Sequence, residues 1–411
     1  MSIYNKDGVK ISLYQGNKKI GRFSIKDKPL NQIDVPEYFV YRTANDDGEF
    51  INVNTSMTDM PDYSSIKVIH EGGLAGAFRL NRNNKISNPN LSSLKEVMDY
   101  GLFYTFSNCD ITEISFPKLE SVGDYGMYCC CFYSSGITSD MIFPKLKSIG
   151  DYGMYQAFNL TSPINVSFPK LESVGDYGMY CSFYSVETIE GDIEFPELTY
   201  IGEFGLMSLF SHNSKVTSLS FPKLELLNNK QAMSTIIGGG SINNTYPIIS
   251  SISFPVLKQV NGLYALSQSF SYCPSLTSIN MPMLEVVGNS GMSGTFQNCS
   301  SLESISLPNL ISIDSYGFDY IFKNCPSLKN VSFPKLSFVG SAGMRSAFQN
   351  CSSLETISFP SLSNITSPLS YAFSGCSNLK EIHFPKALEG NTYLTSSTMG
   401  CPDTTTIYFD L

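Results

Sequence analysis

The sequence lacks the residues and segments that several large classes of protein require. Only 15% of its 411 residues are charged, and the net charge of −9 gives no basic field for binding nucleic acid. No run of about 18 apolar residues is present, so we predict no membrane insertion. The first residues, MSIYNKD, lack the basic and apolar regions of a signal peptide, and we expect none in this chain.

What the sequence does contain is a repeat of about 26 residues. Each copy has a proline that follows a bulky apolar residue. Except after Pro385, leucine stands two positions after the proline, and valine, isoleucine or leucine stands five positions after it. Because this register holds over most of the chain, chance does not explain it. The prolines are Pro117, Pro144, Pro169, Pro196, Pro222, Pro255, Pro282, Pro308, Pro334, Pro360 and Pro385.

One repeat predicts its own local structure. Apolar and polar residues alternate from Ser275 to Met281, which predicts a short strand with one buried face. Pro282 has no N–H to give to a sheet and so ends that strand. From Gly291 to Phe296 we expect a turn of α- or 3₁₀-helix. Since one unit cannot bury its apolar side alone, the units must stack with their strands parallel.

These features predict a mainly β protein with short helical turns, in which stacked repeats form a solenoid with a parallel β-sheet. We expect about 13 repeats of about 25–28 residues over residues 56–411. The copy after Pro222 is longer, and its extra glycine-rich residues predict a protruding loop near 237–247.

Residues 1–55 do not follow the period. Residues 9–14 and 19–25, and again 37–42 and 49–53, flank short polar turns and read as two β-hairpins. This segment is therefore either a small β cap that covers the first apolar layer of the solenoid or an attachment module.

Cysteines recur with the same period. In a regular stack each would have two equal neighbours and no unique partner, so we predict buried thiols that act as small apolar residues rather than disulfides. The Cys-x-x-Cys spacing of a zinc site is absent. Only the run Cys129–Cys131 breaks the period, and it is the place where a reactive thiol would stand. The periodic cysteines are Cys273, Cys299, Cys325, Cys351, Cys376 and Cys401.

The pattern CSSLETISFPSLSNI at 351–365, with the Ala-Phe pair and the cysteine that follow it, resembles the BspA-like (Treponema-type) leucine-rich repeats of bacterial surface proteins. The resemblance extends from about residue 59 to the C-terminus, although this chain has Phe-Pro-Lys-Leu where that family often has Ile-Pro. It implies a leucine-rich-repeat solenoid that works in adhesion or ligand binding and has no catalytic residues. The opening IYNKDGVKISLY is similar to the start of some phage structural and tail proteins.

One motif varies between copies and is therefore a candidate for function. GDYGMY occurs at 123–128, 150–155 and 175–180, whereas later copies have other residues there and still fit the period. Tyrosine is common at recognition surfaces, and Asp beside Tyr suits sugar hydroxyls. The alternative is structural: one Tyr per copy packs into the core and the Asp caps a short helical turn. The candidate residues are Asp124, Tyr125, Tyr128, Asp151, Tyr152, Tyr155, Asp176, Tyr177 and Tyr180.

A second candidate is a group of acids before the prolines, on the outward face of the predicted sheet. It comprises Glu113, Asp140, Asp192 and Glu194. Two such carboxylates can hydrolyse a glycan, but this chemistry needs a cleft, which an open repeat sheet does not offer. Only three histidines exist, far apart along the chain, so they form no triad or metal pair.

We therefore predict a protein without catalytic residues, metal or cofactor. The leading hypothesis is a recognition protein that binds a cell-surface glycan or protein, as a bacterial adhesin or a phage tail or receptor-binding component. The alternatives are a structural virion protein, attached to other virion proteins through residues 1–55, and a glycan-active enzyme. The expected location is the virion or the cell surface.

Overall fold

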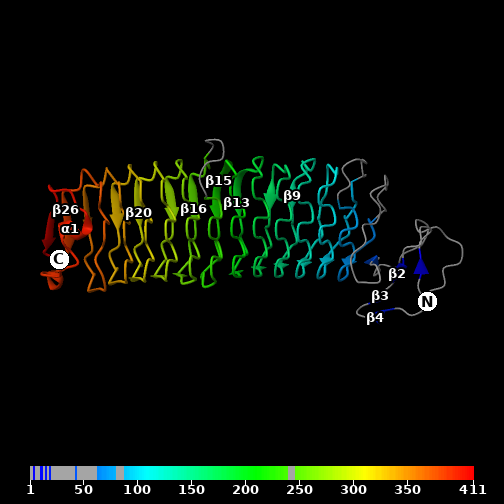
Figure 1. Cartoon of the computed structure of the whole chain (residues 1–411), viewed down its shortest axis with the longest axis horizontal. Helices are drawn as coiled ribbons and strands as arrows, with labels where there is room; N and C mark the ends of the chain where they lie inside the picture. Colours follow the sequence, from blue (N-terminus) through cyan, green and yellow to red (C-terminus); the bar gives the residue numbers. More distant parts are fainter. Residues whose placement is uncertain are drawn as a thin grey trace. The chain divides into compact units, whose positions relative to one another are not determined.

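A computed structural model describes residues 63–79, 88–238 and 246–411, together with the backbone of five short strands between residues 3 and 43. It divides into two compact units, Met1–Ile189 (unit 1) and Glu190–Leu411 (unit 2). The boundary predicted near residue 55, and most of the loop predicted near 237–247, lie outside the described residues. The repeats follow one another in chain order within each unit (Figure 1).

The N-terminal strands are antiparallel. β1 (Ile3–Tyr4) and β5 (Arg42–Thr43) both pair with β2 (Lys10–Ser12). β3 (Tyr14–Gln15) pairs with β4 (Lys18–Lys19) across the turn expected for the first hairpin. The second expected hairpin falls largely outside the described residues.

The repeats of unit 1 form two parallel sheets. In the first, Ser148 lies opposite Ser121 on one side and Ser173 on the other, so each strand pairs with its equivalent in the next repeat. The strands that unit 1 contributes to this sheet are β6 (Val68–Ile69), β7 (Glu96–Val97), β8 (Ser121–Val122), β10 (Ser148–Ile149) and β12 (Ser173–Val174). The second sheet pairs β9 (Met141–Ile142) with β11 (Val166–Ser167).

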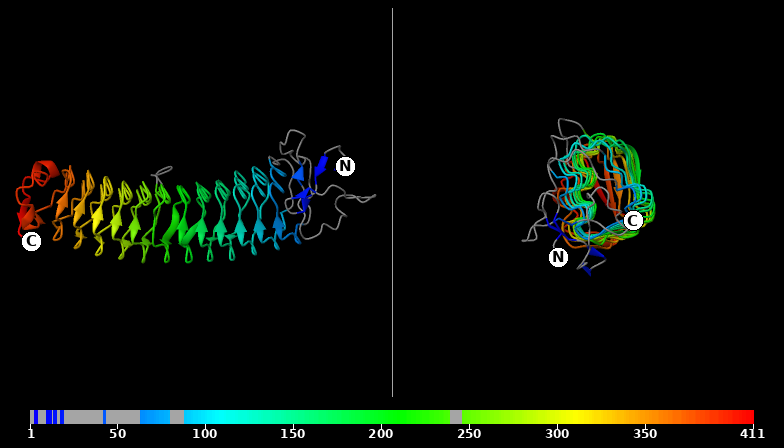
Figure 2. Two further views of the ribbon diagram at one scale, coloured as in Figure 1. Left: turned by 90° about the horizontal axis from the view of Figure 1, so that it is seen from below. Right: turned by 90° about the vertical axis from the view of Figure 1, so that its right-hand side faces the viewer.

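Unit 2 repeats this arrangement, and each of its repeats makes one turn of a coil (Figure 2). Strands that end near the prolines are β13 (Glu190–Glu194), β15 (Lys215–Ser220), β16 (Ser251–Ser253), β18 (Ser278–Asn280), β20 (Ser304–Ser306), β22 (Asn330–Ser332), β24 (Thr356–Ser358) and β26 (Glu381–Phe384). The equivalent strand β27 (Thr406–Phe409) is followed by Asp410 instead. Strands that follow the prolines are β14 (Tyr200–Ile201), β17 (Gln259–Val260), β19 (Val286–Val287), β21 (Ser312–Ile313), β23 (Phe338–Val339) and β25 (Asn364–Ile365). The predicted parallel solenoid fold is thus confirmed.

The predicted apolar rows form the core. In unit 1 the rings of Phe116, Phe143 and Phe168 are buried and stack at 5.6 and 5.1 Å. The periodic cysteines of unit 2 are free, and all but Cys401 are buried. The thiol of Cys299 donates to a main-chain oxygen of the preceding repeat, Phe270 O, at 3.2 Å. The prediction of buried thiols is confirmed.

The segment expected to be a helical turn is a run of linked turns. Thr295 N donates to Met292 O, three residues back, but Met292 N donates to Gly317 O of the next repeat. Every fourth residue, such as Ser290 and Asn298, has a positive φ. A helix would bond its N–H groups within its own segment, whereas here alternate groups bond the neighbouring repeat. We call this run the turn ribbon of a repeat. The described helices are α1 (Ser396–Met399) and the 3₁₀ turn η2 (Lys386–Leu388).

Candidate functional site

The tyrosines of the GDYGMY motif lie on the turn ribbons of unit 1. Tyr125, Tyr152 and Tyr177 begin successive ribbons, and all three are half-buried. Tyr128, Tyr155 and Tyr180, three residues further on, are half-buried as well. The methionine before each of the latter tyrosines is fully buried instead. The alternative in which one tyrosine per copy packs into the core is therefore wrong: both remain at the surface.

The two rows of rings stack along the repeats. Tyr152 lies 4.7 Å from Tyr125 and 4.7 Å from Tyr177 between ring centroids, with interplanar angles of 6° and 8°. Tyr155 lies 4.7 Å from Tyr128 and 4.9 Å from Tyr180, with angles of 3° and 5°. The rows themselves are 5.9 Å apart at Tyr152 and Tyr155. Aromatic pairs of this kind contribute about 0.5–1.5 kcal/mol each beyond the area that they bury, so these contacts stabilise both rows.

The sequence motif missed the first members of both rows. Tyr100 stacks on Tyr125 at 4.9 Å, and Phe103 stacks on Tyr128 at 5.1 Å. The signal was present as Asp-Tyr-Gly at 99–101, the same triplet at the same offset in the repeat. We call these eight rings the tyrosine ladder. Its members are Tyr100, Phe103, Tyr125, Tyr128, Tyr152, Tyr155, Tyr177 and Tyr180.

Partial burial affects the ionisation of four phenols of the ladder. Loss of hydration on burial raises the pKa of Tyr128 and Tyr155 well above the ordinary value, and it raises the pKa of Tyr152 and Tyr180 as well. Each of these hydroxyls is neutral at physiological pH and can both donate and accept a hydrogen bond.

One of the two rows of the ladder lies at unfavourable backbone positions. Tyr100, Tyr125, Tyr152 and Tyr177 have φ between 54° and 57°. The left-handed region costs an L-residue about 1–2 kcal/mol and favours Gly or Asn. Eleven described tyrosines occupy it: Tyr100, Tyr104, Tyr125, Tyr133, Tyr152, Tyr177, Tyr264, Tyr272, Tyr316, Tyr320 and Tyr371. The ribbon imposes this region on every fourth residue whatever its type, as at Gln156 and Leu160, so each of these tyrosines carries a backbone cost.

The aspartates of the motif have a structural role beside the ladder. Asp151 N donates to Asp124 Oδ1 at 2.8 Å, and Asp176 N donates to Asp151 Oδ1 at 2.8 Å. Asp99 Oδ1 accepts in the same way from Asp124 N at 2.9 Å. The predicted capping role is therefore present, but each carboxylate caps the turn of the next repeat. Within the described part of the chain, no Lys or Arg forms an ion pair with Asp99, Asp124 or Asp151.

Of the acids of the second candidate, Asp192 and Glu194 lie on β13, Asp140 directly precedes β9, and Glu113 lies outside the described strands. All four are exposed, Glu113 and Asp140 in unit 1 and Asp192 and Glu194 in unit 2. Asp140 Oδ1 accepts from Asn165 Nδ2 at 2.9 Å.

Asp192 is the most strongly held of these acids. Its Oδ1 accepts hydrogen bonds from the hydroxyls of Ser218 and Thr217, each at 2.7 Å. These bonds lower the pKa of Asp192, so its carboxylate is ionised and tied to its own sheet.

The cysteine run is buried rather than exposed to reagents. Cys129, Cys130 and Cys131 are at most 2% exposed. Burial raises the pKa of the Cys129 thiol to about 12 and raises that of Cys131 strongly. Because the thiolate is the nucleophile, this environment opposes reactivity.

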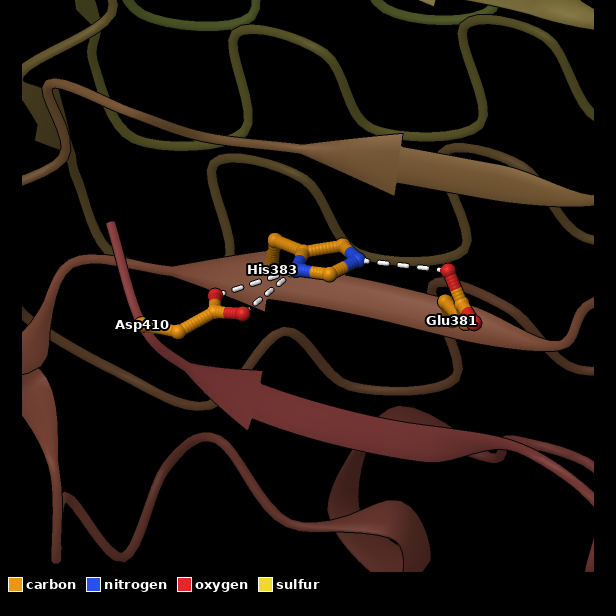
Figure 3. A network of polar contacts seen from close by, with 3 residues as sticks. All are labelled: Glu381, His383 and Asp410. Atoms are coloured by element: carbon orange, nitrogen blue, oxygen red, sulfur yellow. Dashed lines mark hydrogen bonds and ion pairs between the residues drawn. The ribbon is translucent and has the colours of Figure 1, made fainter.

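Unit 2 holds a separate cluster around His383 (Figure 3). Its Nδ1 lies 3.0 Å from Asp410 Oδ1 and its Nε2 lies 3.4 Å from Glu381 Oε2. Across residues 63–79, 88–238 and 246–411, no group of three or more His, Cys, Asp or Glu side chains is arranged to hold a metal. The same ranges contain no helix long and apolar enough to cross a membrane.

Comparison with known families agrees with the repeat geometry. The profile of the BspA type leucine rich repeat region (6 copies) matches residues 3–130, 76–190, 127–261, 234–341 and 292–409. This chain belongs to the BspA-type leucine-rich repeat family. The resemblance inferred from the repeat pattern is confirmed, and the match also includes residues before position 59. No curated protein matches the chain.

Several solved structures are similar to this BspA-type protein. A leucine-rich repeat protein from Bacteroides ovatus is 21% identical, with 86% of this chain and 83% of that one covered and a TM-score of 0.44. A leucine rich cell surface protein from Faecalibacterium prausnitzii is 16% identical, with 77% and 82% covered and a TM-score of 0.33. The pneumococcal vaccine antigen PcpA is 12% identical, with 88% and 85% covered and a TM-score of 0.40.

Proposed function

We propose that this BspA-type protein is a non-enzymatic recognition protein at a cell surface and binds its partner through the tyrosine ladder. The observation that carries the proposal is the ladder itself, because it gathers eight aromatic rings at the partly exposed surface of four successive turn ribbons, whereas the later ribbons do not carry aromatic residues at both of these positions. Tyrosine gives a large contact area at a low cost in conformational entropy, and rings that are already stacked lose little further freedom on binding.

Two further features support recognition over catalysis. The candidate acids are spread over open sheet faces, and Asp192 is tied to neighbouring hydroxyls. Repeat proteins commonly bind through the extended surfaces that their equivalent positions form. A virion location, and attachment through residues 1–55, remain predictions from the sequence.

The repeat at 288–293 supplies a matched test. It carries Ser290 and Ser293 at the positions of Tyr152 and Tyr155 and keeps the same ribbon hydrogen bonds. We expect Tyr152→Ser/Tyr155→Ser to fold and to lose at least about ten-fold in binding to host cells or immobilised surface extracts, as expected for central aromatic contacts. Tyr133→Ser, which removes an exposed ring outside the ladder, is the control. Equal binding by all three proteins would reject the ladder as the site.

A further inference from the structure

The tyrosine ladder carries information about the chemistry of its partner. We propose that the ladder takes an extended basic polypeptide segment, with Arg or Lys side chains on the face toward it, rather than a glycan. This inference rests on the proposed function of the ladder as the recognition surface.

The ring faces are already occupied. Tyr152 has Tyr125 on one face and Tyr177 on the other, both at 4.7 Å. Tyr155 is enclosed in the same way by Tyr128 and Tyr180. A sugar ring stacks on an open aromatic face, and the inner rings of the ladder have none. What they offer to a ligand is ring edges and neutral hydroxyls.

An aspartate directly precedes each leading tyrosine of the ladder, and the charges of Asp176 and Asp151 lie close enough to Tyr152 to contribute to its raised pKa. Asp99, Asp124 and Asp151 are exposed, and each uses Oδ1 to accept a backbone N–H of the next repeat. Equivalent atoms of adjacent repeats are about 4.8 Å apart, so the carboxylates repel one another and are held in place by the backbone. A ligand with donors and positive charge relieves that repulsion.

The guanidinium group is the best match to this surface. It has five N–H donors, no acceptor and a permanent charge, whereas carboxylate and phenol oxygens both accept. The net charge of the whole chain, −9, is also complementary to a positively charged ligand. A sugar hydroxyl has no charge to offset and gains less from the row of acids.

The spacing also fits an extended chain. Four repeats cover about 14 Å at about 4.8 Å per step, and side chains on one face of a strand recur every ~6.8 Å. About three side chains on one face of an extended peptide therefore span the row. The long stems of Arg and Lys absorb the mismatch between the two periods.

The test uses the full-length chain and a fluorescent nine-residue peptide of alternating Arg and Ser. Binding is measured by anisotropy at low ionic strength and again at about 1 M salt, where the Debye length falls to about 3 Å. We expect binding that salt abolishes. The variant Asp99→Asn/Asp124→Asn/Asp151→Asn keeps an oxygen for each backbone N–H but removes the three charges. It should bind the peptide about ten-fold more weakly.

The control Asp110→Asn/Glu113→Gln/Asp140→Asn removes the same charge from exposed positions outside the ribbons. It should bind the peptide nearly as well as the wild type. If the control loses as much affinity for the peptide as the triple Asp→Asn variant of the ribbons, the peptide responds to net charge only and the inference is overturned. Absence of peptide binding by the wild type overturns it as well.

A neutral β-linked glucan separates this inference from the proposed function. If the glucan binds and Tyr152→Ser/Tyr155→Ser abolishes that binding, while the peptide does not bind, the ladder is a recognition surface for a glycan and only the inference fails. If those serine substitutions change neither peptide, glucan nor cell binding, the proposed function fails too.

Discussion

The carboxylate of Asp151 accepts a hydrogen bond from the backbone N–H of Asp176 at 2.8 Å and so ties one turn ribbon to the next. Gly175 leaves the space for it, since a Cβ there would lie 2.5 Å from Asp151 Oδ1. The same aspartate therefore stabilises the stack and adds charge beside the tyrosine ladder. These two roles can be separated, because the hydrogen bond needs only an oxygen whereas the electrostatic role needs an ionised group.

Replacement of Asp151 by Ala removes the acceptor and should lower the free energy of unfolding by about 1 kcal/mol, the usual cost of losing a capping side chain. Asp151→Asn keeps the amide oxygen and should remain close to the wild type. Chemical unfolding of both variants measures the difference. Equal stability of Asp151→Ala and Asp151→Asn would show that the bond contributes nothing.

Backbone strain and ring stacking predict opposite effects at two tyrosines with positive φ. Tyr371 has φ 56° and is 61% exposed, so Tyr371→Asn relieves strain with little loss and should raise the free energy of unfolding by up to about 1 kcal/mol. Tyr152 has φ 54° but stacks on two rings. Tyr152→Asn should lower the free energy of unfolding, because the two stacking contacts that it removes are worth about 1–3 kcal/mol together. Calorimetry checks the signs; stabilisation by both changes would contradict the stacking argument.

The thiols should be inert in the folded protein. All but Cys401 of the eleven cysteines are buried, and burial raises the pKa of Cys129 to about 12 and that of Cys401 to about 11. Very little thiolate therefore exists at neutral pH. In the folded chain, an aromatic disulfide reagent should label every cysteine slowly, and Cys401 should react before the others. After denaturation, the reagent should label all eleven cysteines. Fast labelling of any residue in Cys129–Cys131 would identify a reactive thiol and contradict this account.

The parallel sheets could be predicted because the repeat period leaves few choices. A proline follows most of these strands, and the leucine two residues later is buried, as Leu146 and Leu171 are with no exposed surface. When the same pattern returns after about 26 residues, stacking is the arrangement that buries every row at once. The buried cysteines follow from the same regularity.

The turn ribbon could not be predicted in this way. A helix and a run of linked turns both contain hydrogen bonds from N–H groups to oxygens a few residues back. They differ because, in the linked turns, alternate N–H groups bond another repeat, as Met127 N does with Gly153 O. Nothing in the local composition shows that Tyr125 has a positive φ, since tyrosine rarely adopts it. For the same reason the motif indicated tyrosines of interest but not that their faces are covered by one another.

The pair His383 and Asp410 predicts a dependence of stability on pH at the C-terminal strand (Figure 3). His383 lies on β26, its ring stacks on Tyr408 of β27 at 4.8 Å, and Asp410 follows β27. The hydrogen bond to Asp410 is the main cause that raises the pKa of His383 above its ordinary value, and Glu381 adds to the effect. A raised pKa in the folded state means that folding favours the protonated ring.

The stabilising contribution is therefore complete below the unfolded pKa of about 6.5 and is lost as pH rises through the higher folded pKa. Because the side chain of Asp410 is half exposed, the gain is below about 1 kcal/mol. Unfolding measured from about pH 5 to pH 9 should show this loss in the wild type and a smaller one in Asp410→Asn, which leaves His383 with only Glu381 as an acidic partner. His383→Gln removes the titrating ring and is the reference. If the wild type and Asp410→Asn show the same dependence of stability on pH relative to that reference, the ion pair does not stabilise the pairing of β27 with β26.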